Sequence, residues 1–417
     1  MKKAILLSLN DNTSELKDLA HSLGFEIVKE FIQYRSVPDS SLYMGKGKME
    51  EIKKFVEEEK IQQAFVNGKL RPSQWFNIEK FLGITVYDRI HLILEIFADR
   101  ARRKEAMLQV KLARLRYERP FVRELIHRAK AGEHPGFMAG GEYQVADYYE
   151  MIKKQMRKLK KELEKIRKER EIRREQRREK GFYLVSLAGY TNAGKSSLLN
   201  ILTGESVRIE ERLFSTLSPT TKMVKKWNEK MEIMPVLVTD TVGFIQDLPH
   251  WLVDAFHSTL EEIELADVVV LVVDASDEID VMMEKLSVSL KEIAQMHVHP
   301  KIIVALNKID LVNKEEIRRK KREIETHVNK KCIPISSKTG ENISKLVEEI
   351  YNLIPKLVTI ELEFPSDKAK DAIMFLKEDM KIINFEYDGT SKICIKCSPR
   401  MKEKLIGKYR KLIEGNK

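Results

Sequence analysis

Four short motifs in the second half of the chain combine residue types that suit the binding of a nucleoside triphosphate. The first follows an apolar run at 183–188 and precedes a helix-favouring run at 195–202, which is the setting of a phosphate-binding loop. In such a loop the Lys195 ammonium faces the β- and γ-phosphates, and the Ser196 hydroxyl can ligate Mg²⁺. The residues that we expect to bind phosphate here are Gly189, Tyr190, Thr191, Asn192, Ala193, Gly194, Lys195, Ser196 and Ser197.

The second motif, Asp240-Thr241-Val242-Gly243, ends the apolar run at 234–239. We expect Asp240 to hold Mg²⁺ through a water molecule and the Gly243 amide to face the γ-phosphate. The next residue is Phe244, where Ras-like enzymes carry a glutamine that orients the attacking water. A phenyl ring cannot do this, so another residue or a partner must supply that group.

The third and fourth motifs predict which base is read. Asn307-Lys308-Ile309-Asp310 follows the apolar run at 301–306, and Ser336-Ser337-Lys338 follows a run at 332–335. The Asp310 carboxylate can accept hydrogen bonds from guanine N1–H and the 2-amino group, which adenine cannot match. Asn307 would brace the loop, Lys308 would cover the base, and a backbone amide near Ser337 would bond the guanine carbonyl. The complete set predicts GTP, and it disfavours a small-molecule kinase that shares the phosphate loop.

A polar segment between the first two motifs is the natural place for a switch that senses the γ-phosphate. We expect Thr216 to ligate Mg²⁺ only when that phosphate is present, with Thr220 and Thr221 as rivals. The catalytic residues are then Lys195, Thr216 and Gly243, and the Mg²⁺ ligands are Ser196, Thr216 and Asp240. The segment adds to the nucleotide site Phe214, Ser215, Thr216, Leu217 and Ser218.

Charge is concentrated in one part of the chain. Residues 151–180 hold 15 Lys and Arg against 6 Glu, so this segment alone has a net charge of +9. The net charge of the whole chain is +11. Apolar residues recur at helical spacing up to Ile166 and then stop, although the composition still favours a helix. An extension without an apolar face suits RNA phosphates better than packing, and a solvated linker is the alternative. The residues predicted to contact RNA are Arg173, Arg174, Arg177 and Arg178.

Upstream, a second apolar stripe predicts a helix over about 89–127 that pairs antiparallel with residues 152–166. The stripe on the first helix comprises Ile93, Phe97, Ala101, Leu108, Leu112 and Leu115, and that on the second Ile152, Met156, Leu159, Leu163 and Ile166. A glycine-rich stretch at 127–144 would form the tip of this hairpin.

The predicted fold class is α/β, with a Ras-like P-loop GTPase domain at 181–356. It is preceded by a small α/β domain at 1–88 with mostly parallel strands and by the helical hairpin with its basic extension at 89–180. A small α+β domain follows at 357–417. The 417 residues and three cysteines suit a multidomain protein of a reducing compartment, and Cys394 and Cys397 are best explained as ordinary core thiols. We expect a cytoplasmic monomer without a membrane span, at most loosely associated with a membrane.

Several further motifs resemble those of one family. They are Tyr43-Met44-Gly45-Lys46-Gly47-Lys48, Arg71-Pro72-Ser73-Gln74, Asp88-Arg89, Ile96-Phe97-Ala98-Asp99-Arg100-Ala101, Gln109-Val110-Lys111-Leu112-Ala113, Phe214-Ser215-Thr216-Leu217, Leu248-Pro249-His250 and the run from Ala255 to Glu262. Together they resemble HflX-type ribosome-associated GTPases over about residues 1–355, rather than the Obg or Era types. The chain departs at 140–144, where the family usually has Gly-Pro-Gly-Glu-Thr-Gln.

The resemblance implies a factor that binds the large ribosomal subunit and its RNA, directs the hairpin tip toward the peptidyl transferase centre, and splits stalled or idle ribosomes. It also implies ATP binding by the amino-terminal half. In related GTPases an asparagine at the position of Asn192 coordinates K⁺, although Asn192 could equally serve only to shape the loop. The alternative function is an RNA-binding or remodelling factor that acts away from the ribosome and uses ATP.

Overall fold

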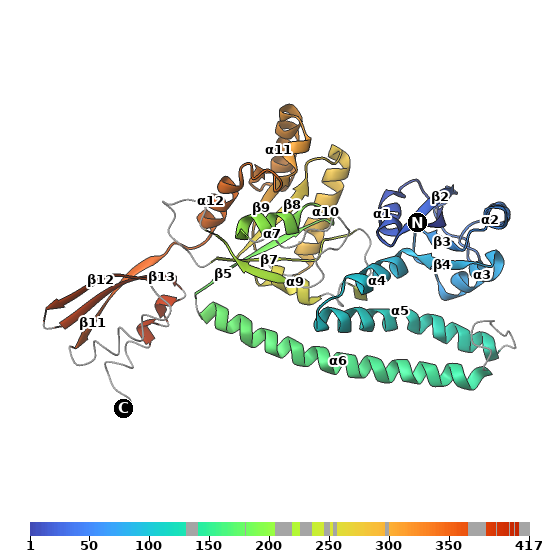
Figure 1. Cartoon of the computed structure of the whole chain (residues 1–417), viewed down its shortest axis with the longest axis horizontal. Coiled ribbons are helices and arrows are strands. Elements are labelled where there is room, and N and C mark those ends of the chain that lie inside the picture. The colour runs from blue at the N-terminus through green and yellow to red at the C-terminus, as the bar shows by residue number, and fades with distance from the viewer. Residues whose placement is uncertain are drawn as a thin grey trace. The chain divides into compact units, whose positions relative to one another are not determined.

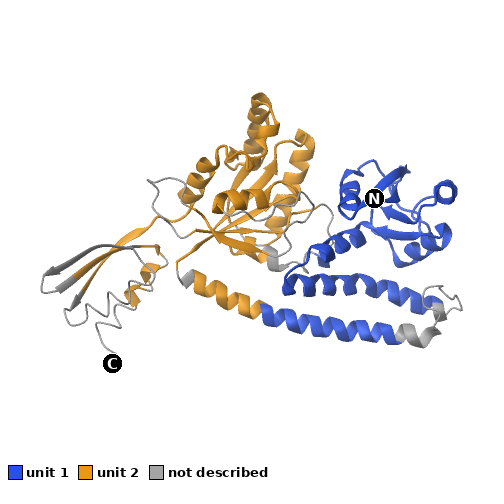
Figure 2. Cartoon of the chain, viewed as in Figure 1, with its two compact units in different colours: residues 1–166, 210–218, 247–258 blue, residues 167–209, 219–246, 259–417 orange. Residues whose placement is uncertain are grey.

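The computed structural model describes residues 1–130, 141–179, 181–204, 219–225, 236–245, 251–252, 257–296, 300–365, 381–388, 390–399, 401–403 and 405–407. Contacts group the chain into two compact units (Figure 2). The first contains residues 1–166, 210–218 and 247–258, and the second contains residues 167–209, 219–246 and 259–417. The division into four domains stays a prediction. The two units are defined by contacts between residues, and their boundaries do not coincide with the domain boundaries expected from the sequence.

The amino-terminal part of the first unit is a parallel α/β sheet. Its strands β1 (Lys2–Ser8), β2 (Phe25–Ile32), β3 (Gln63–Val66) and β4 (Thr85–Asp88) lie in the order β2-β1-β3-β4, and every pair is parallel. The connecting helices are α1 (Ser14–Ser22), α2 (Lys46–Glu58) and α3 (Pro72–Leu82). Strand β3 is buried along its whole length, as expected for a parallel strand covered on both faces. This parallel pairing agrees with the mostly parallel strands expected for this part of the chain.

The helical part of this unit differs from the single long helix predicted over 89–127. The chain instead forms α4 (Arg89–Arg100) and α5 (Lys104–Lys130), because Ala101 leaves the helical conformation with φ −67° and ψ 106°. Helix α6 (Gly141–Glu179) then runs antiparallel to α5 (Figure 1). Leu112 and Leu115 of α5 pack against Ile152, Met156 and Leu159 of α6, so the predicted pairing is confirmed for this part of the two stripes. The other predicted members Ile93 and Phe97 lie on α4, Ala101 ends that helix, and Ile166 is not part of this cluster.

The second unit contains a six-stranded sheet. Its strands are β5 (Tyr183–Gly189), β6 (Thr220–Met223), β7 (Val236–Asp240), β8 (Val268–Asp274), β9 (Lys301–Asn307) and β10 (Cys332–Pro334), in the order β10-β9-β8-β5-β7-β6. Only β6 is antiparallel to its neighbour in this sheet. Strand β5 is buried along its whole length and β8 up to Val273, because helices cover both faces of the sheet (Figure 1).

Two apolar clusters lie on the two faces of this sheet. Helices α7 (Lys195–Thr203) and α12 (Ile343–Leu353) contribute to one cluster, and α9 (His257–Glu264), α10 (Ile279–Gln295) and α11 (Lys314–Val328) contribute to the other. This arrangement confirms the predicted α/β class and brings the carboxyl ends of β5, β7, β8 and β9 to one edge. Ligands bind at that edge in open parallel sheets.

The described carboxyl-terminal residues form a separate antiparallel sheet. Strands β11 (Val358–Pro365), β12 (Lys381–Asp388) and β13 (Thr390–Cys397) lie in the order β11-β13-β12. Within the described residues, none of the helices combines the length and the apolar character that crossing a bilayer requires.

Candidate functional site

The phosphate-loop motif lies between β5 and α7, with a backbone that only particular residues can adopt. Gly189 has φ +142° and Gly194 has φ +94°. A Cβ atom at Gly189 would lie 2.3 Å from the carbonyl oxygen of Val272, and one at Gly194 would lie 2.3 Å from the Asn307 side chain. Because both positions combine a left-handed φ with a close neighbour, glycine is required at each. Asn192, with φ +62°, is an exposed asparagine at a position that this residue type tolerates.

Lys195 opens α7 and turns its side chain back onto the loop. Its Nζ donates hydrogen bonds to the carbonyl oxygens of Tyr190 at 2.7 Å and Gly189 at 3.2 Å. Burial lowers the Lys195 pKa to about 8, and the nearby Asp240 carboxylate opposes that shift. A buried ammonium beside backbone carbonyls favours an anionic partner strongly, since its charge has lost most of its hydration.

The acid of the second motif lies beside the phosphate loop. The Ser196 hydroxyl donates a hydrogen bond of 2.7 Å to Oδ2 of Asp240, which is buried at the end of β7. A hydroxyl next to a carboxylate is an oxygen-only donor set that fits Mg²⁺, because this ion usually takes few protein ligands together with phosphate oxygens. Thr241 is committed elsewhere, since its hydroxyl donates to the Leu187 carbonyl oxygen at 2.7 Å.

Gly243 and Phe244 touch the phosphate loop directly. The Phe244 amide donates to the Gly189 carbonyl oxygen at 3.0 Å, and the Thr191 amide donates to the Phe244 carbonyl oxygen at 2.9 Å. A Cβ atom at Gly243 would lie 2.8 Å from Lys195 Nζ. The Phe244 ring is buried in the cluster that contains Ala188 and Ile263. The ring therefore belongs to the core, which agrees with its unsuitability for orienting water. Val242 is also buried.

The expected base-reading residues lie together at the ends of β9 and β10. The buried Asn307 donates to the Ala193 carbonyl oxygen at 2.8 Å and accepts from the Ser337 amide at 2.9 Å, so it joins the first, third and fourth motifs. The Ser336 hydroxyl donates to Oδ1 of the exposed Asp310 at 2.6 Å. Ile309 is buried beneath the loop, whereas Lys338 is exposed.

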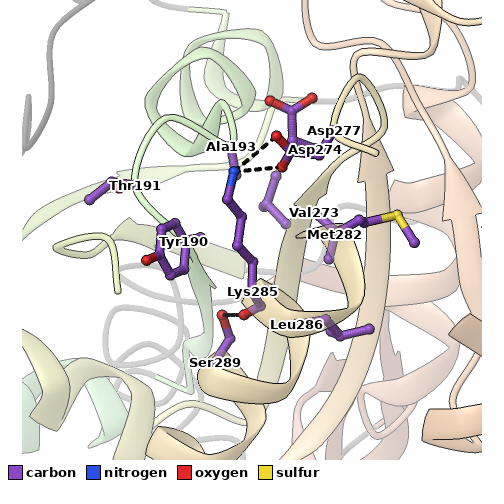
Figure 3. Close-up of a pocket in the computed structure, with 11 residues that line it drawn as sticks. Tyr190, Thr191, Ala193, Val273, Asp274, Asp277, Met282, Lys285, Leu286 and Ser289 are labelled. Carbon is purple, nitrogen blue, oxygen red and sulfur yellow. Dashed lines mark hydrogen bonds and ion pairs between the residues drawn. The ribbon is translucent and has the colours of Figure 1, made fainter. Parts of the chain in front are cut away.

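The sequence reasoning missed two acidic residues beside the site. Asp274 ends β8 at the same sheet edge and forms an ion pair of 2.5 Å with Lys308, which has φ +64°. Both carboxylate oxygens of Asp277 accept hydrogen bonds from Lys285 of α10 (Figure 3). Asp274, Asp277 and Lys285 line a cavity of about 10 Å³ beside the Tyr190 ring, which is room for one water molecule. The signal was present in the sequence, since Asp274 ends an apolar strand just as Asp240 does.

The switch segment is placed only in part. Phe214, Ser215, Thr216, Leu217 and Ser218 lie outside the described residues. The two alternative candidates for the switch threonine, Thr220 and Thr221, both belong to β6. Thr220 pairs with Asp240 of β7, and the Thr221 hydroxyl lies 2.9 Å from the Thr239 hydroxyl. The assignment of Thr216 as the switch threonine stays a prediction.

The four arginines predicted to bind RNA do not share one environment. Arg173 is exposed and Arg177 is half-buried, while the side chain of Arg178 lies outside the described residues. Arg174 is buried, and its guanidinium forms ion pairs with Glu261 at 2.7 Å and Glu262 at 2.6 Å. We therefore withdraw Arg174 from the RNA-binding set, because its charge is already paired inside the protein. The sequence reasoning failed here because the acidic partners lie far along the chain.

Comparisons with known proteins show similarity to GTP-binding proteins along most of the chain. Family models described as GTP-binding GTPase N-terminal, GTP-binding GTPase Middle Region and 50S ribosome-binding GTPase match residues 10–98, 100–177 and 184–308. "GTPase HflX" of Thermococcus kodakarensis is 37% identical over 91% of this chain and 87% of its own length. "GTPase HflX" of Methanocaldococcus jannaschii is 39% identical over 88% of each chain.

A solved structure described as the complex of SsGBP and GDP is 29% identical, with a TM-score of 0.50, over 85% of this chain and 98% of that one. The match to the family model of the 50S ribosome-binding GTPase, over residues 184–308, includes the phosphate loop, Asp240 and Asn307. With the nucleotide site assembled at one sheet edge and such identity over nearly the full length, this chain is a GTP-hydrolysing enzyme that belongs to the HflX family of GTPases.

Proposed function

We propose that this GTPase binds the large ribosomal subunit and splits stalled or idle ribosomes, with GTP hydrolysis as its switch. The observation that supports the proposal best is that the nucleotide site and the basic end of helix α6 belong to the same compact unit. Residues 167–179 of α6 belong to the same unit as the phosphate loop, and Arg173 is exposed there. The family description as a 50S ribosome-binding GTPase supports the choice of partner.

In the proposed reaction, the residues of the loop bind GTP and neutralise its charge. The loop amides and Lys195 hold the β- and γ-phosphates, Asp310 and the backbone near Ser337 read guanine, and Gly243 senses the γ-phosphate. Mg²⁺, held by Ser196 and, through water, by Asp240, would neutralise the developing phosphate charge. Thr216 would complete the Mg²⁺ site in the GTP state. K⁺ beside Asn192 is a further proposal, tested by replacing K⁺ with Na⁺ in the hydrolysis assay.

Sedimentation tests the proposed partner directly. The full chain is centrifuged through a sucrose cushion with isolated large ribosomal subunits, in a GTP analogue that resists hydrolysis or in GDP. We expect co-sedimentation that is stronger with the GTP analogue, and separation of 70S ribosomes into subunits in the same nucleotide. Equal, weak recovery in both nucleotides at low salt would contradict the proposal, because a switch must bind its target differently in its two states.

Arg173 and Arg177 supply the test of RNA contact. Neutralising both as Arg173→Gln and Arg177→Gln should weaken subunit binding and reduce the slope of log affinity against log salt by about 0.7–0.9 for each lost phosphate contact. The matched control is Glu175→Gln, an exposed neighbour on the same helix. An unchanged salt slope would mean that this part of α6 is only a solvated helix face.

Two narrower expectations accompany this proposal. A cytoplasmic location follows from a ribosomal target. ATP binding by residues 1–88 stays a separate prediction, and equilibrium dialysis of the full chain with ATP in the presence of saturating GDP would test it.

A further inference from the structure

Helix α6 is attached to α9 by a cluster of charged side chains, in which Arg174, Glu261 and Glu262 are buried and Arg170 is half-buried. Glu261 accepts from Arg170 at 2.5 Å and from Arg174 at 2.7 Å, and Glu262 accepts from Arg174 Nη2 at 2.6 Å. A second nitrogen of Arg174, Nε, donates to the same Glu262 oxygen at 3.2 Å. All four residues belong to the second unit, so the cluster is an internal feature of that unit.

Burial makes this cluster different from the other charges of α6. The side chains of Arg174 and Glu262 are only 8% and 7% exposed. Burial opposes the charge on Arg174, yet Glu262 and Glu261 outweigh it and raise the Arg174 pKa. Removing one partner from such a cluster leaves an unpaired charge in the interior, which is strongly unfavourable. Breaking the contact between α6 and α9 should therefore cost more free energy than breaking an exposed ion pair, which contributes little to stability.

A second contact holds the chain just before α9. In the first unit, Arg116 Nη1 of α5 donates to the Trp251 carbonyl oxygen at 3.3 Å. The Trp251 ring is stacked on that of Tyr117, with centroids 6.5 Å apart and an angle of 25° between planes. The stretch that follows Gly243 thus contacts α5 at Trp251 and α6 at Glu261 and Glu262. These are the two helices of the hairpin.

We infer that the four residues Arg170, Arg174, Glu261 and Glu262 are positioning residues that couple the nucleotide state at Gly243 to the helical hairpin. Helix α6 is continuous from Gly141 to Glu179, so its attachment to α9 reaches the hairpin through the helix itself. When the chain after Gly243 responds to the γ-phosphate, α9 carries that response to α6. The effect of this coupling on stimulation of GTP turnover by ribosomal subunits rests on the proposed function, whereas the coupling between nucleotide and hairpin does not.

Two variants and a control test the inference in the full-length chain. Glu262→Gln keeps an oxygen that accepts from Arg174 but removes the charge, and Arg174→Gln removes the opposite charge. Lys168→Gln removes an exposed positive charge from the same helix and serves as the control. GDP affinity reports that each variant is folded. If Arg174→Gln fails to fold, Glu262→Gln alone decides the outcome.

The first readout needs no ribosome. Amide hydrogen exchange is measured over residues 147–166 of α6 in GDP and in a GTP analogue that resists hydrolysis. We expect exchange rates to differ at least about fivefold between nucleotides in the unaltered protein and in Lys168→Gln, and to become equal in Glu262→Gln. Equal rates in the unaltered protein would overturn the inference, and so would a difference that survives in both cluster variants.

The second readout is GTP turnover with and without large ribosomal subunits. We expect the stimulated rate to fall about tenfold in either cluster variant, while unstimulated turnover and GDP affinity stay within about twofold. The double variant should lose no more than either single variant, because both act on one contact. A protein that subunits never stimulate would refute the proposed function and leave the exchange result to decide the coupling.

Discussion

Lys195 shows how surroundings change the chemistry of one residue. Its ammonium lies buried against the carbonyl oxygens of Tyr190 and Gly189, and its pKa is lowered to about 8. Near pH 7 it is mostly charged, although it has lost much of its hydration. Phosphate oxygens can replace the missing water, so nucleotide binding and protonation of Lys195 must favour each other.

This coupling predicts proton uptake on binding. Above about pH 8 the free protein holds Lys195 mostly neutral, and the bound diphosphate raises its pKa again. At about pH 9 GDP binding should take up most of one proton, and the share of the uptake that belongs to Lys195 should be small near pH 7, where this ammonium is already mostly protonated. Calorimetry in two buffers of different ionisation enthalpy measures it. Equal binding enthalpies in both buffers at pH 9 would contradict the placement of Lys195.

Base choice is a second property of a single residue. Asp310 is exposed and accepts from the Ser336 hydroxyl, which leaves the rest of its carboxylate available to a base. In Asp310→Asn we expect GTP affinity to fall at least about a hundredfold and the preference to shift toward xanthosine triphosphate, whose 2-oxo group can accept from the amide. A competition assay with both nucleotides measures the shift. Retained guanine preference would remove Asp310 from the base site.

At the scale of elements, the hairpin depends on apolar packing and not on charge. Ile152 of α6 is fully buried against α5, whereas its neighbour Met151 is 43% exposed. The charged residues of this region form mainly exposed ion pairs such as Lys153 with Glu150, which contribute little. The apolar seam between α5 and α6 must therefore hold the two helices together.

A pair of adjacent alanine variants tests this. Ile152→Ala should lower the local unfolding free energy of the hairpin by about 2–5 kcal/mol, because it leaves a cavity, whereas Met151→Ala should change it by less than about 0.5 kcal/mol. Hydrogen exchange over residues 147–166 measures the change. GDP affinity should change by less than about twofold in both variants, because neither side chain belongs to the nucleotide site. Similar protection in both variants would argue against the seam.

For the whole molecule, the decisive feature is that the residue after Gly243 is a phenylalanine, whose ring cannot orient the attacking water. Phe244 occupies that position and is buried in the core beside Ala188 and Ile263. We expect slow hydrolysis by the free protein and stimulation of at least about tenfold by large ribosomal subunits. Phe244→Leu should keep both rates within about threefold, because the ring packs and does not react. Phosphate release assays measure them, and fast turnover that ignores subunits would exclude this explanation.

Local sequence patterns were sufficient to predict the reaction and much of the architecture. The four nucleotide motifs, the parallel strands and the apolar seam of the hairpin are local patterns, because strand and helix periodicity and loop chemistry act over a few residues. The break between α4 and α5 at Ala101 was not visible, since an apolar stripe continues across it.

The pairing of charges could not be predicted from local patterns, because it depends on contacts between distant parts of the chain. Arg173 and Arg174 are adjacent in sequence, yet one is exposed and the other is buried between Glu261 and Glu262. The same holds for Asn307, whose amide joins the phosphate loop to Ser337. Such partners lie far apart along the chain, and only folding brings them within hydrogen-bonding distance. Composition and spacing therefore predicted the chemistry of this GTPase, whereas long-range packing decided how its charges are used.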